Sequence, residues 1–193
     1  MLAVATFSSV KSANRSARVA ERSLLVGLRP ILIPSREDDP PERVRFGDDQ
    51  ALTVPGHGGA AAVANDHIYL AIALRNGGSG IAVIHGWYVA VRERATEEPA
   101  PVDEFRRQQL DLYVPAGDIG FWYGALRDPD EPSYRPVREA VESRTRVLVD
   151  LLYGDHEGGQ RMITRFAIAH WEGVVGERVL ALRHWNVDRS DPR

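Results

Sequence analysis

The sequence contains no cysteine among its 193 residues. This absence excludes a disulfide framework and a zinc site built from thiolates, and it is compatible with a cytosolic protein. No stretch of about 18 consecutive apolar residues is present, which excludes a membrane-spanning helix within the sequence as written. The apolar segment 1–7 is short and follows no charged residue, so we do not expect a secretory signal peptide.

Extremes of composition are also absent. Hydrophobic residues make up 44% of the chain and charged residues 26%, which is close to an ordinary soluble globular protein. These values exclude a fully disordered chain and a collagen-like or coiled-coil fibre. The 17 glycines and 12 prolines, many of them in turn-like contexts, favour β structure.

The net charge of −3 is distributed unevenly. Residues 1–29 hold five basic side chains and one acidic side chain, a net of +4, so the remainder carries −7. A basic arm on an acidic body predicts that the arm meets an anionic surface. Nucleic acid is not expected as the main partner, because phosphate binding needs clustered positive charge on the binding domain.

Residues 1–28 are predicted to form one amphipathic helix. Its small apolar residues recur at intervals of three and four and fall within about 80° on a helical wheel: Val10, Ala13, Ala17, Ala20, Leu24 and Leu28. Its basic residues form a second stripe on another face: Lys11, Arg15, Arg18, Arg22 and Arg29. Pro30 ends the helix, because the residue before a proline disfavours helical backbone angles.

After Pro30 the hydrophobic period changes from 3.6 to 2, which predicts strands in the segment 29–193. His67–Arg75 alternates clearly, and residues 81–92 are predicted to place their odd-numbered side chains on a single face. Residues 35–66 are interpreted mainly as loop, with Gly56–Gly59 in a mobile part of it, and a short helix is expected at 137–143. The predicted fold is mainly β: an N-terminal helix, then an antiparallel immunoglobulin-like β-sandwich of about 7–9 strands.

Two turn motifs carry a family resemblance. The turn Asn76-Gly77-Gly78-Ser79-Gly80-Ile81-Ala82 resembles an N-x-G-x-G-x-A pattern, and the hairpin Tyr153–Phe166 resembles a Y-x-D-x-x-G-x-x-x-x-T-x-F pattern. With the Ala/Ser/Arg-rich helix that runs into Arg29-Pro30, they are similar to uncharacterised bacterial proteins with a juxtamembrane helix and an immunoglobulin-like sandwich. The resemblance implies a fold and carries no catalytic residue across. It also implies that residues 2–7 are the end of a membrane span starting upstream, with the helix and sandwich on the cytoplasmic side.

Candidate catalytic groups are few. Three histidines, His85, His170 and His184, lie near tryptophans on predicted strands. Three converging imidazoles would suit a catalytic zinc ion, but the histidines show no close H-x-H spacing, and His170 and Trp171 must point in opposite directions. We therefore expect core tryptophans with histidines near the rim and no metal or other cofactor. The turn Asp155-His156-Glu157 is interpreted as solvated.

The run Phe121-Trp122-Tyr123 is a possible interaction surface, because three adjacent aromatic residues on a strand must divide between its two faces. The alternative is that the run lies under the loop at 128–143. The leading functional hypothesis is a non-enzymatic interaction or accessory module on an unknown protein partner. Lys11, Arg15, Arg18 and Arg22 would contact an anionic membrane surface or that partner. The alternatives are self-association through the helix, a subunit of a multimeric assembly, and a small hydrolase or metal-dependent enzyme using the strand histidines.

Overall fold

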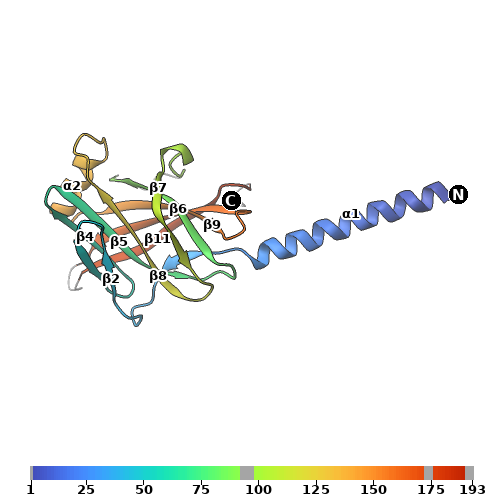
Figure 1. The fold of residues 1–193 in the computed structure, drawn as a ribbon, viewed down its shortest axis with the longest axis horizontal. Helices are drawn as coiled ribbons and strands as arrows, with labels where there is room; N and C mark the ends of the chain where they lie inside the picture. The colour runs from blue at the N-terminus through green and yellow to red at the C-terminus, as the bar shows by residue number, and fades with distance from the viewer. Residues whose placement is uncertain (1, 92–97, 172–175, 190–193) are drawn as a thin grey trace.

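A computed structural model describes residues 2–91, 98–171 and 176–189 of the chain; within its first helix, the side chains of residues 2–12, 22 and 26 also lie outside the description. A long helix leads into a strand-rich domain, whose described residues also form a short α-helix and a 3-10 helix (Figure 1). The elements are α1 Leu2–Gly27, β1 Leu32–Pro34, β2 Glu42–Arg45, β3 Ala51–Val54, β4 Gly58–Ala64, β5 His67–Asn76, β6 Ala82–Ala90, η1 Val102–Glu104, β7 Arg106–Val114, β8 Ile119–Leu126, α2 Tyr134–Glu142, β9 Val147–Asp155, β10 Arg161–His170 and β11 Glu177–Asn186.

Nine of the strands form one curled antiparallel sheet. Strands β4 and β1 pair with one edge of β5, at residues 67–72 and 74–76, and β8 pairs with the other edge along residues 68–75. From β8 the sheet therefore runs through β5, β4, β11, β10, β9 and β6 to β7. The sheet curls until its two end strands, β7 and β8, lie side by side, although the described ladders join them to other partners. Strands β2 and β3 form a separate hairpin. The predicted mainly β fold with an N-terminal helix and a sheet of this size is confirmed.

The main core lies inside the curled sheet, and β5 shows how the sequence builds it. Ile68, Leu70, Ile72 and Leu74 point into this core. The residues between them, Tyr69, Ala71 and Ala73, point outward and pack under the β2–β3 hairpin with Val44, Phe46 and Val54. The alternation in the sequence therefore places β5 correctly, but both of its faces are buried.

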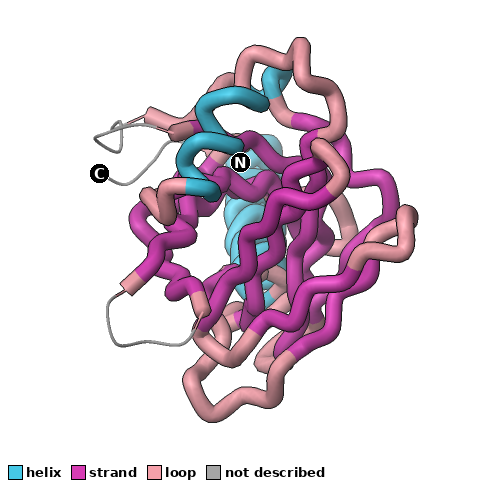
Figure 2. The backbone as a smooth tube through the Cα atoms, turned by 90° about the vertical axis from the view of Figure 1, so that its left-hand side faces the viewer, coloured by secondary structure: helices cyan, strands magenta, loops and turns pink. Residues whose placement is uncertain are grey.

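Helix α2 closes one end of the curled sheet, and α1 leaves from the opposite end (Figures 1 and 2). Tyr134, Val137 and Ala140 are buried in the main core, at the spacing of one helix face. The helix starts three residues earlier than expected, because Pro136 falls in the first turn, where no intrahelical NH bond is needed. Among the described residues, no helix is long and apolar enough to cross a membrane.

Two expectations about the strands are wrong. Gly58 and Gly59 begin strand β4 and do not lie in a mobile loop, and β4 links β5 to β11. Alanine and glycine have low β propensity, so tertiary packing and not local preference makes this segment a strand. The packing is close: a Cβ atom on Gly59 would lie 2.9 Å from Val179 Cγ2. In β6 the single-face prediction fails because a bulge at His85 shifts the register, which puts Ile84 and Trp87 on the core side together.

The sequence of residues 103–109 is compatible with one helical turn, followed by a strand over the alternating residues 110–114, but the structure differs. A 3-10 turn covers Val102–Glu104, and β7 begins at Arg106. The strand therefore starts four residues before the position that the hydrophobic pattern indicates. The first four residues of β7 are all polar, so they show no alternation of apolar and polar residues that would predict a strand.

Candidate interaction surfaces

The base of α1 is joined to the β domain by the turn between β5 and β6. The main-chain NH of Ser79 donates to the carbonyl oxygen of Arg29 at 3.0 Å. A Cβ atom added to Gly80 would lie 1.8 Å from the carbonyl oxygen of Leu28. Glycine is required at position 80 by this close backbone approach, and the turn fixes the direction in which the chain leaves the helix.

Asn76 is the centre of this junction and is fully buried. Its Nδ2 group donates to the carbonyl oxygens of Gly80 (2.6 Å) and Val114 (2.9 Å). Its Oδ1 atom accepts from the main-chain NH groups of Ile31 (3.1 Å) and Gly78 (2.9 Å). A side-chain amide has two donor hydrogens and two acceptor lone pairs, so the hydrogen-bonding capacity of Asn76 is fully used for structure.

A second polar chain runs from the junction into the sheet. Arg29 donates to Asn186 Oδ1 at 2.7 Å. His184 Nδ1 lies 2.9 Å from Thr164 Oγ1, and the hydroxyl of Tyr153 lies 2.9 Å from the same Thr164 atom. Burial raises the pKa of Tyr153 to about 12, so its hydroxyl stays protonated at neutral pH. This chain ties Arg29 to β10 and β11 and leaves His184 engaged within the domain.

The hairpin turn after β9 holds the last turn of α1. The side-chain amide of Gln160 donates to the main-chain oxygen of Leu25. Asp155 accepts from the NH of Gly159 at 2.9 Å and from Gln160 Nε2 at 3.3 Å. The expectation of a wholly solvated turn is therefore wrong for Asp155, which is buried, although His156 beside it is exposed.

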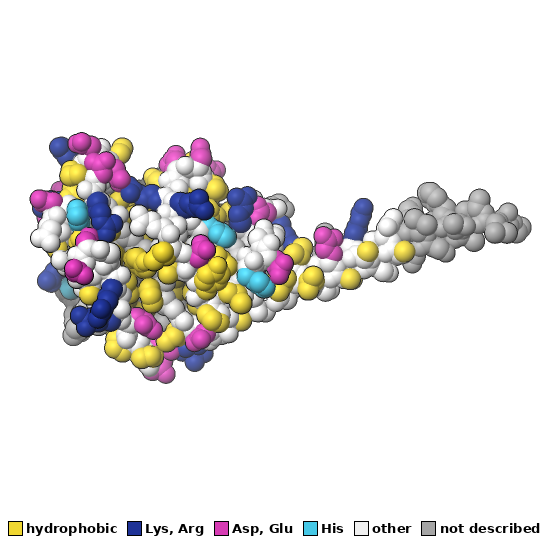
Figure 3. Space-filling model, in the orientation of Figure 1, with side chains coloured by type: hydrophobic (Ala, Val, Ile, Leu, Met, Phe, Trp, Pro, Cys, Tyr) yellow, Lys and Arg dark blue, Asp and Glu magenta, His cyan; other side chains and the backbone are white. Residues whose placement is uncertain are grey.

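Beyond this junction, α1 extends clear of the β domain (Figure 3). The side chains of residues 13–21 are exposed, Arg15 and Arg18 among them. The side chains of Lys11 and Arg22, which complete the predicted basic stripe, lie outside the described residues. The described part of the helix therefore offers its basic residues to the surroundings and does not pack along the sheet.

The aromatic run 121–123 divides between the two faces of β8 as expected. Trp122 is fully buried in the main core, where its ring lies 5.5 Å from that of Trp87. This burial removes Trp122 from the proposed interaction surface. Phe121 and Tyr123 are half-buried on the other face and pack with Phe46 near the β2–β3 hairpin, not under the loop at 128–143. Their role in binding a partner stays a prediction.

The three strand histidines are held apart. His170 lies at one end of the β10–β11 hairpin opposite Glu177, and His184 pairs with Thr164 towards the other end. His85 lies at the β6 bulge, where burial and the nearby Arg161 lower its pKa. In the described part of the chain, no three His, Asp or Glu side chains are grouped so that they could hold a metal ion.

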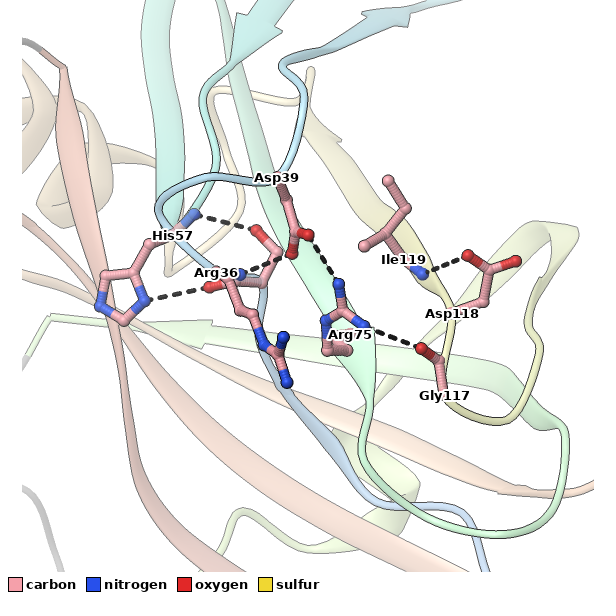
Figure 4. Close-up of polar contacts among 8 residues, drawn as sticks. Arg36, Asp39, His57, Arg75, Gly117, Asp118 and Ile119 are labelled. Atoms are coloured by element: carbon pink, nitrogen blue, oxygen red, sulfur yellow. Dashed lines mark hydrogen bonds and ion pairs between the residues drawn. The ribbon is translucent and has the colours of Figure 1, made fainter.

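A polar cluster at the loop before β2 is built for structure (Figure 4). Arg75 donates to Asp39 Oδ1 at 2.6 Å and to the carbonyl oxygen of Gly117 at 2.8 Å. Asp39 also accepts from the NH of Arg36 at 2.6 Å. These bonds lower the pKa of Asp39, the bond from Arg75 most of all. The cluster pins two loops to β5.

Sequence reasoning missed a buried ion pair on the outer face of the sheet. Asp150 of β9 and Arg165 of β10 are 2% and 3% exposed, and the guanidinium donates to both carboxylate oxygens at 2.6 Å. The guanidinium also lies 5.0 Å from the ring centre of Trp185. The signal in the sequence was one charged residue in the interior of each of two apolar strands, Asp150 in β9 and Arg165 in β10.

Comparison of the chain with protein-family models, curated proteins and solved structures finds no match.

Proposed function

We propose that this protein is a non-enzymatic interaction module whose N-terminal helix docks the β domain on an anionic membrane surface on the cytoplasmic side. The observation that carries the proposal is the exposed helix α1, which leaves a tightly fixed junction and presents Arg15 and Arg18 away from the domain. The acidic remainder of the chain would face away from the same surface. The resemblance to juxtamembrane bacterial proteins, still a prediction, points to the same placement.

The expected affinity is modest. A basic residue near an anionic leaflet contributes about 1 kcal/mol to the free energy of binding. The four basic residues Lys11, Arg15, Arg18 and Arg22 would therefore contribute about 4 kcal/mol, which equals an apparent Kd of about 1 mM. The apolar stripe consists mainly of alanine, which adds little insertion energy. Binding should therefore be reversible and sensitive to salt.

Vesicle co-sedimentation tests the proposal. The wild-type chain should bind phosphatidylglycerol-containing vesicles at low salt and lose binding at about 1 M salt, where the Debye length is about 3 Å. Arg15→Glu/Arg18→Glu should abolish the binding. Arg43→Glu/Arg45→Glu makes the same change of charge at two exposed residues of β2 and should retain it. Equal binding to neutral vesicles, or equal loss in both double variants, would overturn the proposal.

Self-association through α1 is the second candidate, because Leu24 on the apolar stripe is 63% exposed. An exposed leucine on an alanine-rich helix face is suited to packing against a second helix. Light scattering without vesicles distinguishes the two candidates. Under self-association the wild-type chain would be at least a dimer and Leu24→Lys a monomer, whereas the membrane proposal expects a monomer in both cases. A hydrolase or metal-dependent enzyme using the separated histidines has no comparable observation in its favour.

A further inference from the structure

A cleft of about 230 Å³ lies where the curled sheet fails to close, between β7 and β8. This volume is below the ~300 Å³ of a pocket for a drug-sized ligand, so it suits a few atoms of an extended chain better than a compact small molecule. Its walls come from the first half of β7, the second half of β8 and the segment around Phe46. Two strand edges that face one another without a shared ladder are a place where a further strand can add.

Gln108 spans the cleft and occupies the position that a main-chain amide would take. The side chain of Gln108 is directed from β7 to β8, where its Nε2 group contacts the carbonyl oxygen of Tyr123 at 3.5 Å, the long limit for a hydrogen bond. The residue is 8% exposed, and its Oε1 atom has no hydrogen-bond partner in the described part of the chain. A buried amide oxygen without a donor is costly, so a ligand that supplies an NH group would be stabilised here.

The backbone beside Gln108 is irregular in the same place. The pairing of β6 with β7 passes from Ile84–Leu112 to Gly86–Arg107, so residues 108–111 of β7 lie opposite His85 alone. The main-chain groups of this bulge are therefore not used in a regular ladder with β6. Bulges of this kind often lie beside binding sites, where they redirect side chains.

Three arginines determine the charge that the cleft would accept. Arg106 covers the ring of Trp87 at 5.1 Å and pairs with Glu131, and Arg127 donates to Asp48 at 3.0 Å. Arg107 is exposed and has no carboxylate at ion-pair distance in the described part of the chain. Arg106 and Arg127 each bind a carboxylate of the chain itself, so a carboxylate of a ligand is the group that suits Arg107.

We propose that the β7–β8 cleft binds an extended acidic segment of a partner protein as an added strand. Main-chain NH groups of the segment donate to Gln108 Oε1 and the carbonyl oxygen of Tyr123, and one of its carboxylates pairs with Arg107. An apolar side chain of the segment packs on the aromatic rings of Phe46 and Tyr123, which lie 5.4 Å apart. The inference depends on the proposed function only in treating the β domain as a binding module; it does not require the helix or a membrane.

Peptide titration in solution, without vesicles, tests this site. The probe is the blocked pentapeptide Glu-Val-Glu-Val-Glu, and its lysine counterpart is the comparison. We expect amide NMR shifts at residues 106–109 and 123–125 with a Kd of about 1 mM or tighter for the acidic peptide. The lysine peptide should bind at least tenfold more weakly.

Variants make the test specific. Arg107→Glu should reverse the preference between the two peptides, and Gln108→Leu should weaken binding of the acidic peptide about tenfold. Arg135→Glu, at an exposed position of α2, should leave that binding unchanged. Thermal melts confirm that each variant is folded. Equal binding of both peptides, no shifts at saturating peptide, or an Arg107→Glu variant that behaves as wild type would overturn the proposal. The Arg15→Glu/Arg18→Glu variant should bind the peptide normally, which separates failure of this site from failure of membrane docking.

Discussion

Helix α1 and the β domain are stabilised by different means, although regular periodicity predicts both. The described side chains in the middle of α1 are exposed, so its stability comes from the helix propensity of alanine, arginine and leucine and from the junction at its base. The β domain instead buries both faces of β5 and all of β9. Because the β domain is stable through its own buried core and α1 is exposed, α1 is available to contact a partner.

The largest expected effect contrasts one side chain from each region. Trp122→Ala should lower the free energy of unfolding by about 3–5 kcal/mol, because it removes a fully buried ring from the main core. Leu24→Ala on the exposed helix should change it by less than about 0.5 kcal/mol. Urea unfolding followed by circular dichroism measures both. A large loss in Leu24→Ala would mean that the helix packs on the domain.

The buried Asp150–Arg165 ion pair tests how much paired charges contribute to the stability of the β domain. Asp150→Asn should cost about 3–5 kcal/mol, because the Arg165 guanidinium would stay buried without its charge partner. The double variant Asp150→Leu/Arg165→Met removes both charges and should recover most of that loss. A double-mutant cycle in urea gives the coupling between the two residues. A fully additive cycle would show that the two side chains do not depend on each other.

These two regions also show what the sequence could predict. Alternation in His67–Arg75 and the helical stripe of residues 1–28 are local patterns, and both elements are found. Strand β4 has no such pattern, because alanine and glycine fit there only through packing on Val179 from a distant strand. The bulge at His85 depends on how β6 pairs with β7 and β9, and the cleft beside Gln108 depends on where β7 lies next to β8. Both features depend on contacts between strands that are separated in the sequence, so a local sequence pattern cannot predict them.

The junction is the place where the two regions can be separated. Gly80→Ala would put a Cβ atom 1.8 Å from the carbonyl oxygen of Leu28, so the turn or the helix base must move. We expect a loss of about 1–2 kcal/mol and faster amide exchange confined to residues 24–32. Gly47→Ala is the matched control, because its Cβ atom would meet nothing within 4 Å. Uniformly faster exchange across the β domain would contradict a local role for this turn.

The smallest expected effect concerns a surface cluster of the β domain. The pKa of Asp39 is lowered in the folded protein, mainly by the hydrogen bond from Arg75. Its carboxylate therefore stabilises the fold above the pKa of about 3.9 in the unfolded chain, and this stabilisation is lost as the pH falls through the lower folded value. Asp39→Asn should have a lower urea midpoint than the wild type at pH 7, and the difference should shrink steadily below about pH 4. A difference that stays constant with pH would assign the effect to hydrogen-bond geometry instead of charge, and the loop would then be pinned by the shape of the cluster alone.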